Sequence, residues 1–101
     1  MIGNIRFASR KEAKRYGDLR LMEIAGAISD LQVQPKYILQ EDFIKNGKKY
    51  RKIEYIADFF YVTKPNLEMI VEDCKGYRNE IYKIKKKLFE YKYKEFSIRE
   101  I

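Results

Sequence analysis

Apolar residues recur with two different periods along the chain, and these periods separate strands from helices. Residues 53–62 and 67–75 are rich in β-branched and aromatic side chains, which favour half-buried strands. Between them, residues 63–66 combine threonine, lysine, proline and asparagine, a composition typical of a turn. We therefore expect residues 53–75 to form a β-hairpin that ends at Gly76.

Capping residues and helical periodicity predict one helix on each side of this hairpin. Ser9 and Glu12 form a capping box that opens a helix reaching about Ala25, and Gly26 stops that helix. A second helix is expected over residues 79–91, with an apolar and a basic face. The apolar face carries Ile81, Ile84, Leu88 and Tyr91, and the opposite face carries Lys83, Lys87, Glu90 and Lys94.

Shorter segments complete the pattern and define the fold class. Residues 28–33 and 96–98 have the character of strands, and Gln34-Pro35 breaks the chain after the first of them. Residues 37–44 are expected to form a second hairpin with the chain from Lys48 onward, because Asn46-Gly47 favours a tight primed turn. The prediction is one small α+β domain over residues 1–101, with the order helix, three or more strands, helix, strand.

Two acids and a lysine stand out in the first hairpin. Asp58 interrupts one apolar strand, and Asp73-Cys74-Lys75 ends the other. A four-residue loop pairs Val62 with Leu67. In that register Asp58, Asp73 and Lys75 project from one side of the sheet. The two carboxylates are then diagonal neighbours, with Cβ atoms about 7–8 Å apart, close enough to bind one divalent cation.

The alternative for these residues is a structural role. A carboxylate inside so apolar a strand costs free energy unless it binds a metal or forms an ion pair, here Asp58 with Lys75. Glu72 faces away from Asp73 and is a weaker candidate. Cys74 is expected to face inward, with its carbonyl available to a metal. Because the chain has no histidine, nothing marks the Cys74 thiol as a nucleophile.

Composition narrows the kinds of site and partner. A single cysteine excludes an internal disulfide, and the absence of histidine argues against a zinc site. Carboxylates alone suit a hard cation such as Mg²⁺ or Mn²⁺. The chain shows no signal peptide and no apolar run that could span a bilayer, so we expect a soluble cytoplasmic protein.

The formal net charge is +7, and the basic residues gather near the start, around residues 45–52 and after residue 77. Phosphate backbones attract such surfaces, although a solvated basic surface without a partner would look the same. Most aromatic residues, including Tyr55, Phe59, Tyr61 and Phe89, are expected in the core, whereas Tyr77 is a candidate for stacking on a base. The candidates for binding nucleic acid are Lys48, Lys49, Arg51, Tyr77, Arg78, Lys83, Lys86 and Lys87.

The pattern of acids resembles the PD-(D/E)xK nuclease superfamily, whose signature is an acid on one strand and acid-x-Lys on the next. Asp58 and Asp73-Cys74-Lys75 match it, although Ile56-Ala57 precede the first acid where the signature has proline. From about Phe7 onward the chain also looks like a small phage- and prophage-associated family of nuclease-like proteins. The matching motifs lie at residues 9–13, 26–31, 34–35, 55–59 and 71–76.

The resemblance implies a restriction-endonuclease-like αβββαβ core, a mixed sheet flanked by two helices, and Mg²⁺- or Mn²⁺-dependent hydrolysis of DNA. Asp58, Asp73 and the Cys74 carbonyl would bind the metal, and Lys75 would position or help to deprotonate water. Glu12 matches the glutamate on the first helix that completes many such sites, although capping alone also explains it. Gln34 falls at a motif position, where it could orient water or a phosphate or make a structural hydrogen bond.

By analogy alone, the family suggests a branched-DNA resolvase, encoded by a phage or prophage and acting in a bacterial host cell. Because one such domain cuts one strand, cleavage of both strands would require a homodimer. The rival hypothesis is an accessory protein with the same fold that binds nucleic acid and does not cut it. A basic protein–protein adaptor in a phage assembly is the third hypothesis.

Overall fold

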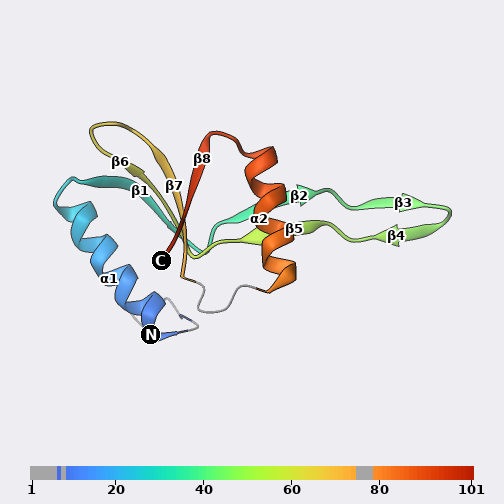
Figure 1. Ribbon diagram of the computed structural model, residues 1–101, viewed down its shortest axis with the longest axis horizontal. Coiled ribbons are helices and arrows are strands. Elements are labelled where there is room, and N and C mark those ends of the chain that lie inside the picture. The colour runs from blue at the N-terminus through green and yellow to red at the C-terminus, as the bar shows by residue number, and fades with distance from the viewer. Residues whose placement is uncertain (1–6, 8, 75–78) are drawn as a thin grey trace.

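A four-stranded mixed sheet forms the centre of the molecule (Figure 1). It is seen in a computed structural model that describes residues 7, 9–74 and 79–101. Strand β6 is antiparallel to β1 and to β7, whereas β8 runs parallel to β7. In the order in which they lie side by side, the strands are β1 (Ile28–Val33), β6 (Phe59–Thr63), β7 (Met69–Asp73) and β8 (Phe96–Glu100).

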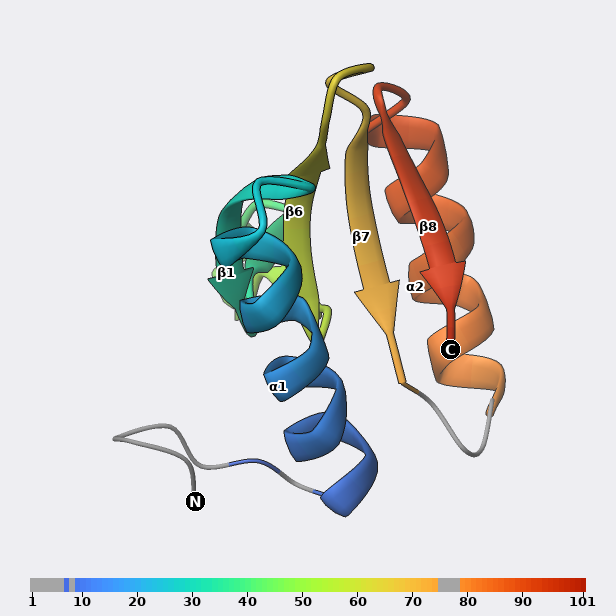
Figure 2. The same cartoon turned by 90° about the vertical axis from the view of Figure 1, so that its left-hand side faces the viewer.

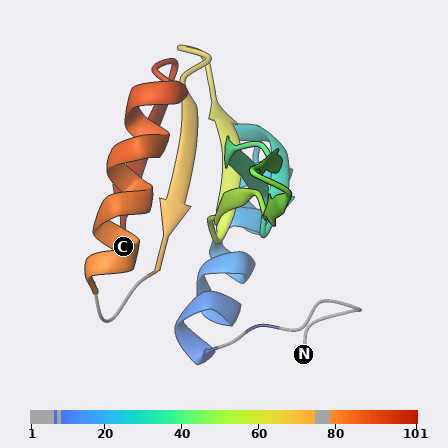
Figure 3. The same ribbon diagram turned by 90° about the vertical axis from the view of Figure 1, so that its right-hand side faces the viewer.

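Two helices lie on opposite faces of this sheet (Figures 2 and 3). Helix α1 (Arg10–Ile24) is capped by the Ser9 hydroxyl, and helix α2 (Glu80–Lys92) is capped by the Asn79 side chain. Gly26 follows α1 with φ +82°, a value that favours glycine. The predicted helices and α+β class are confirmed, and neither described helix is long and apolar enough to cross a membrane.

A long two-stranded ribbon is inserted between β1 and β6. Its root is the antiparallel pair β2 (Lys36–Gln40) and β5 (Ile53–Ile56), and its tip is the pair β3 (Phe43–Lys45) and β4 (Lys48–Tyr50). The tip turns at Asn46-Gly47, where both residues have positive φ, as the predicted hairpin requires. The tip projects from the rest of the fold (Figure 1), and the molecule, ribbon included, extends 54 Å along its longest axis.

Each face of the sheet covers its own apolar core, because side chains alternate along the strands. Residues Phe59 and Tyr61 of β6 point toward α1, and Phe60 between them points toward α2. The buried residues on the α1 side are Leu19, Ile28, Phe59, Tyr61, Ile70 and Cys74. Those on the α2 side are Tyr55, Ala57, Phe60, Val71, Tyr82 and Phe89. The four aromatic residues predicted for the core are all buried.

The continuous strand predicted over residues 53–62 is wrong. Strand β5 ends at Ile56 and pairs with β2, whereas β6 begins at Phe59 and pairs with β1 and β7. At the junction the Ala57 N–H donates to the Pro35 carbonyl at 3.1 Å. The chain therefore passes from one sheet to another at Ala57 and Asp58, a change of partner that strand propensity does not reveal.

The predicted register of the hairpin is also wrong, by two residues. Val62 pairs with Met69 and not with Leu67. The Thr63 N–H donates to the Glu68 carbonyl at 2.9 Å, so Thr63 belongs to the ladder and the turn is displaced to residues 64–67. A shift of two residues keeps each side chain of the ladder on its predicted side, because side chains alternate with a period of two.

Helix α2 buries a different stripe from the apolar face read in the sequence. Ile84 and Tyr91 of that face are 58% and 75% exposed, whereas Tyr82 and Phe89 are 7% and 0% exposed. The Phe89 ring packs against three other aromatic rings with centroid distances of 4.8 to 5.2 Å, those of Tyr37, Tyr55 and Tyr93. This ring cluster fixes the rotation of the helix, and it leaves the stripe of Ile81, Ile84, Leu88 and Tyr91 on the surface.

We expect Phe89→Ala to lower the free energy of unfolding by about 3–5 kcal/mol, because it leaves a cavity within the ring cluster. Tyr91→Ala, in the same helix, should change it by no more than about 0.5 kcal/mol. Urea denaturation of both variants measures the difference. Equal losses would show that α2 is rotated from the position described.

Candidate functional site

Asp58 lies at the bend between β5 and β6, and its backbone is held on both sides. Its N–H donates to the Glu72 carbonyl at 3.1 Å, and its carbonyl accepts from the Gln34 N–H at 2.8 Å. Its half-buried side chain accepts a hydrogen bond at Oδ2 from the N–H of Cys74. The Asp58 carboxylate therefore contacts the peptide group that joins Asp73 to Cys74.

Asp73 is the last residue of β7, and its side chain is fully buried. The Tyr55 hydroxyl donates to its Oδ2 at 2.5 Å. Burial raises the pKa of Tyr55 far above its usual range, and the negative charges of Asp73 and Asp58 raise it further. The structure thus brings Asp58 and Asp73 together near one phenolic hydroxyl, which stays protonated.

Glu72 points toward α1, away from Asp73, as the alternation of the strand requires. Arg15 binds its carboxylate with two nitrogens, at 2.8 Å to Oε1 and 2.5 Å to Oε2, and the Tyr61 hydroxyl also donates to Oε2. The hydrogen bonds to Glu72 raise the pKa of Arg15 above its usual range. Burial, followed by Glu72, raises the pKa of Tyr61 to about 12. Glu72 is therefore held in a closed ion-pair network.

Glu12 on α1 is also buried, and its N–H donates to the Ser9 hydroxyl at 3.2 Å, as capping requires. The negative charge of Glu12 also affects Cys74, the residue that follows β7. Burial raises the pKa of the Cys74 thiol to about 11, and Asp58, Glu72 and Glu12 contribute to the rise in that order. Cys74 faces the core on the α1 side, as predicted. Glu12 belongs to α1, whereas the Asp73 side chain is hydrogen-bonded to Tyr55 of the core on the α2 side.

At pH 8, Cys74 should react with iodoacetamide about a hundredfold more slowly in the folded protein than in urea. The pKa of its thiol is about 11 in the fold against an ordinary value of 9.0. At pH 8 the reactive thiolate is therefore about a hundredfold less abundant in the folded protein. Because the folded pKa is the higher, the thiol stabilises the fold below pH 9 and loses this contribution as the pH rises toward 11. Mass spectrometry follows the modification. Equal rates would place the thiol at the surface.

Three predicted site residues lie outside the described residues: Lys75, Tyr77 and Arg78. The same holds for the predicted Asp58–Lys75 ion pair and for the side of the sheet that Lys75 takes. Among the residues that are described, no group of three or more acidic or cysteine side chains is arranged to hold a metal ion. Gln34 is exposed, with φ +54°, and its main chain is what touches Asp58.

Comparison with protein families gives one assignment. Residues 1–101 match a family described as "Protein of unknown function (DUF1064)". The chain belongs to this family. Searches among curated proteins and among solved structures give no match. This family description names no activity.

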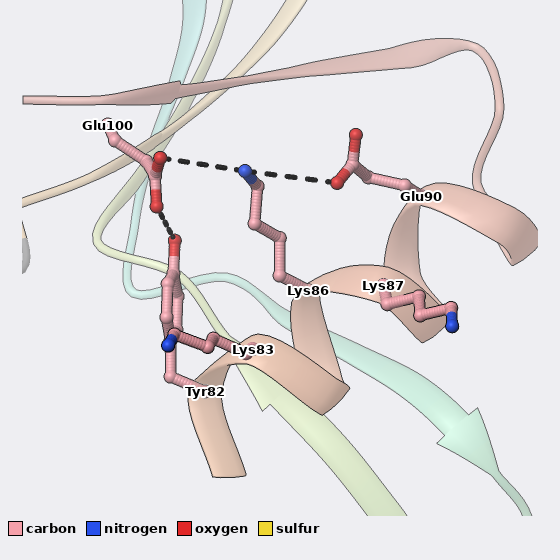
Figure 4. A pocket seen from close by; sticks show the side chains of 6 residues that line it. All are labelled: Tyr82, Lys83, Lys86, Lys87, Glu90 and Glu100. Carbon is pink, nitrogen blue, oxygen red and sulfur yellow. Dashed lines mark hydrogen bonds and ion pairs between the residues drawn. The ribbon is translucent and has the colours of Figure 1, made fainter. Parts of the chain in front are cut away.

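Three of the predicted phosphate-binding lysines line one hollow beside the sheet (Figure 4). Its volume is about 500 Å³, and it is lined by Tyr82, Lys83, Lys86, Lys87, Glu90 and Glu100. Glu100 accepts from the Tyr82 hydroxyl at 2.8 Å and lies 3.5 Å from the Lys86 ammonium. Because β7 and β8 pair Asp73 with Glu100, the hollow borders the strand end that carries Asp73.

Tyr55 and Glu100 were missed as site residues by the sequence reasoning. Tyr55 was assigned only to the core, where its ring does lie, and no local signal marks its hydroxyl as a partner of Asp73. Glu100 follows the predicted last strand, and nothing in its neighbourhood indicates that β8 sets it beside Asp73. Lys48 and Lys49 lie on β4 and Arg51 follows that strand in the ribbon, and none of the three lines the hollow.

Proposed function

We propose that this protein is a metal-dependent endonuclease that hydrolyses phosphodiester bonds of DNA. The observation that carries the proposal is the hydrogen bond from the Cys74 N–H to the Asp58 carboxylate, directly beside Asp73. Two acids from neighbouring chain segments give the oxygen donors that a hard cation prefers. The match of Asp58 and Asp73-Cys74-Lys75 to the PD-(D/E)xK signature supports the same function.

The donor set fits Mg²⁺ or Mn²⁺. Mg²⁺ usually keeps several waters and binds proteins through one or two carboxylates, so it does not need a complete protein cage. Asp58 and Asp73 would hold the ion, with the Cys74 carbonyl as a further ligand. The predicted role of Glu12 gains no support, because Glu12 belongs to α1 and the Asp73 side chain faces the core on the α2 side. When bound, the ion supplies an acidified water and polarises the scissile phosphate.

Hydrogen bonds from neighbouring groups fix the orientation of the two carboxylates. The Tyr55 hydroxyl fixes one oxygen of Asp73, and the Cys74 N–H fixes one oxygen of Asp58. Lys75, which follows in the signature, would position or help to deprotonate the attacking water and offset the charge of the transition state. Gln34 holds the Asp58 carbonyl through its main chain and so supports the geometry.

Phosphates outside the reacting group would be held by basic side chains. Lys83, Lys86 and Lys87 surround the hollow beside β8, which borders the strand end of Asp73 (Figure 4). Tyr77 and Arg78 follow the signature in sequence and are proposed to add a stacking and a phosphate contact. The net charge of +7 favours the approach of a polyanion.

A non-catalytic accessory protein that binds nucleic acid is the second candidate, and the burial of Asp73 favours it. The Asp73 side chain has 0% exposure and a hydrogen bond from Tyr55. A buried carboxylate with such a partner can serve the fold without binding a metal. On this reading the basic surface binds DNA and the two aspartates are structural.

Nicking of supercoiled plasmid with Mg²⁺, with Mn²⁺ and with EDTA separates the candidates. A nuclease nicks with metal and stops with EDTA, whereas the accessory protein shows salt-sensitive DNA binding and no cleavage with either metal. Absence of both would leave only the third hypothesis, the protein–protein adaptor. A panel of linear, nicked, flap and four-way-junction DNAs then tests the resolvase analogy, and cleavage of both strands would indicate a homodimer.

A further inference from the structure

We propose that the ribbon tip, residues 43–50, binds in the major groove of duplex DNA and holds the duplex along the ribbon toward Asp58. This inference rests on the proposed function for the nature of the ligand. The shape, the charge and the position of strands β3 and β4 support it independently of the candidate metal site.

The ribbon tip has no part in either core. Every residue from 40 to 53 is exposed. A two-stranded ribbon without a core is only marginally stable, so it contributes little to the stability of the domain. A ribbon of two strands is, however, an element that the major groove of B-DNA admits, since that groove is about 12 Å wide. Its projection from the fold leaves both of its faces open to such a ligand (Figure 1).

The charges on the ribbon tip repel one another. Lys45 and Lys48 are directly opposed across β3 and β4, and Lys49 lies opposite Ile44. Like charges in directly opposed positions destabilise a strand pair. Residues 43–50 include no acid, whereas Glu41 and Asp42 line one hollow with Lys49 and Arg51. The opposed pair Lys45 and Lys48 is not part of that hollow. The phosphates that line a groove would neutralise these side chains, and counterions released from the DNA would favour binding.

Local contacts give the ribbon tip a defined shape despite this repulsion. The rings of Phe43 and Tyr50 stack with centroids 4.8 Å apart and planes at 11°, and the Lys48 ammonium lies 5.1 Å from the Tyr50 ring centre. Asn46 and Gly47 adopt the positive φ of a primed turn, which matches the twist of the strands. The ribbon tip is thus preorganised for a ligand, which lowers the entropy cost of binding.

The ribbon connects directly to the candidate metal site. Strand β5 runs from the ribbon to Ala57 and Asp58. Asp58 lies ten positions after Lys48, which corresponds to an extended length of at most about 33–36 Å. This length is close to one turn of B-DNA, about 34–36 Å. The ribbon tip therefore contacts the duplex up to one turn from the proposed cut. A-form RNA, whose major groove is deep and narrow, should not accept it.

Fluorescence anisotropy with a labelled 30-bp DNA duplex, measured at several salt concentrations, tests the inference. In Lys45→Gln/Lys48→Gln we expect binding at least about tenfold weaker and a salt slope smaller by about 2. The control Lys64→Gln/Lys94→Gln removes the same charge from exposed positions away from the ribbon tip, and its slope should change by less than about 1. Single-stranded DNA and duplex RNA should bind both variants alike.

Equal weakening by the two double variants, equal effects on single strands, or no duplex binding by the wild type would each overturn the ribbon proposal. Plasmid nicking by the same proteins separates this failure from a failure of the nuclease proposal. DNA binding that depends on the ribbon tip, without nicking, would support the ribbon proposal and refute the nuclease proposal. Plasmid nicking by a Lys45→Gln/Lys48→Gln protein that binds DNA like the wild type would refute the ribbon proposal and support the nuclease proposal.

Discussion

Asp73→Asn is expected to lower metal-dependent nicking of plasmid DNA by at least about a thousandfold. Asparagine keeps the shape of the side chain and an oxygen that can accept from the Tyr55 hydroxyl, but it loses the charge that would bind the proposed cation. Metal activation is worth several kcal/mol in the transition state, and each 1.36 kcal/mol corresponds to a factor of ten. Initial rates of nicking with Mn²⁺ measure the effect.

The matched control is Asp30→Asn. Asp30 is exposed on β1 with φ +57°, a conformation that asparagine tolerates well, so this variant should nick at the wild-type rate. Thermal unfolding of both variants shows whether the fold is kept. Nicking by a folded Asp73→Asn protein at more than a tenth of the wild-type rate would refute the assignment of Asp73 as a metal ligand.

Arg15→Ala is expected to lower the free energy of unfolding by about 3–5 kcal/mol. Glu72 is fully buried, and Arg15 neutralises it through two hydrogen bonds. Removal of Arg15 leaves a buried carboxylate without its counter-charge, which costs far more than the loss of a surface pair. Urea denaturation, monitored by circular dichroism, gives the value.

Two further variants make this stability prediction specific. Lys14→Ala, at an exposed neighbouring position of α1, should change the free energy of unfolding by no more than about 0.5 kcal/mol. The pair Arg15→Met/Glu72→Leu should regain most of the loss, because apolar side chains can replace a buried ion pair. A loss below about 1 kcal/mol in Arg15→Ala would mean that Glu72 does not depend on Arg15.

Much of the fold could be predicted because its signals are local. The cap at Ser9 and the turn at Asn46-Gly47 each depend on a few adjacent residues, and both occur in the structure. Strand β1 and the final strand β8 also follow from short runs of suitable residues.

The predictions that were wrong concern features set by contacts between distant parts of the chain. The break at Ala57 and Asp58 exists because β5 finds β2 while β6 finds β1 and β7, and local propensity contains no information on these partners. The rotation of α2 depends on rings brought from three other segments to Phe89. Two apolar stripes share that helix, and periodicity alone cannot choose between them.

In the candidate site, too, the local features could be predicted and the long-range contacts could not. The proximity of Asp58 and Asp73 follows from one hairpin, and the structure places them on adjacent segments in spite of the wrong register. The partners of this pair come from elsewhere: Tyr55 from the far side of the sheet junction and Glu100 from the last strand. Such partners depend on tertiary packing, so they could not be read from spacing.

Binding of Mn²⁺, followed by electron paramagnetic resonance, tests the central claim that Asp58 and Asp73 hold a divalent cation. The account predicts uptake of about one Mn²⁺ per wild-type chain, with affinity at least about tenfold lower in Asp58→Asn and unchanged in Asp30→Asn. Asp58 is the more suitable of the two acids for this test, because it is only half-buried. Failure of the wild type to take up Mn²⁺, or equal uptake by Asp58→Asn, would contradict the claim.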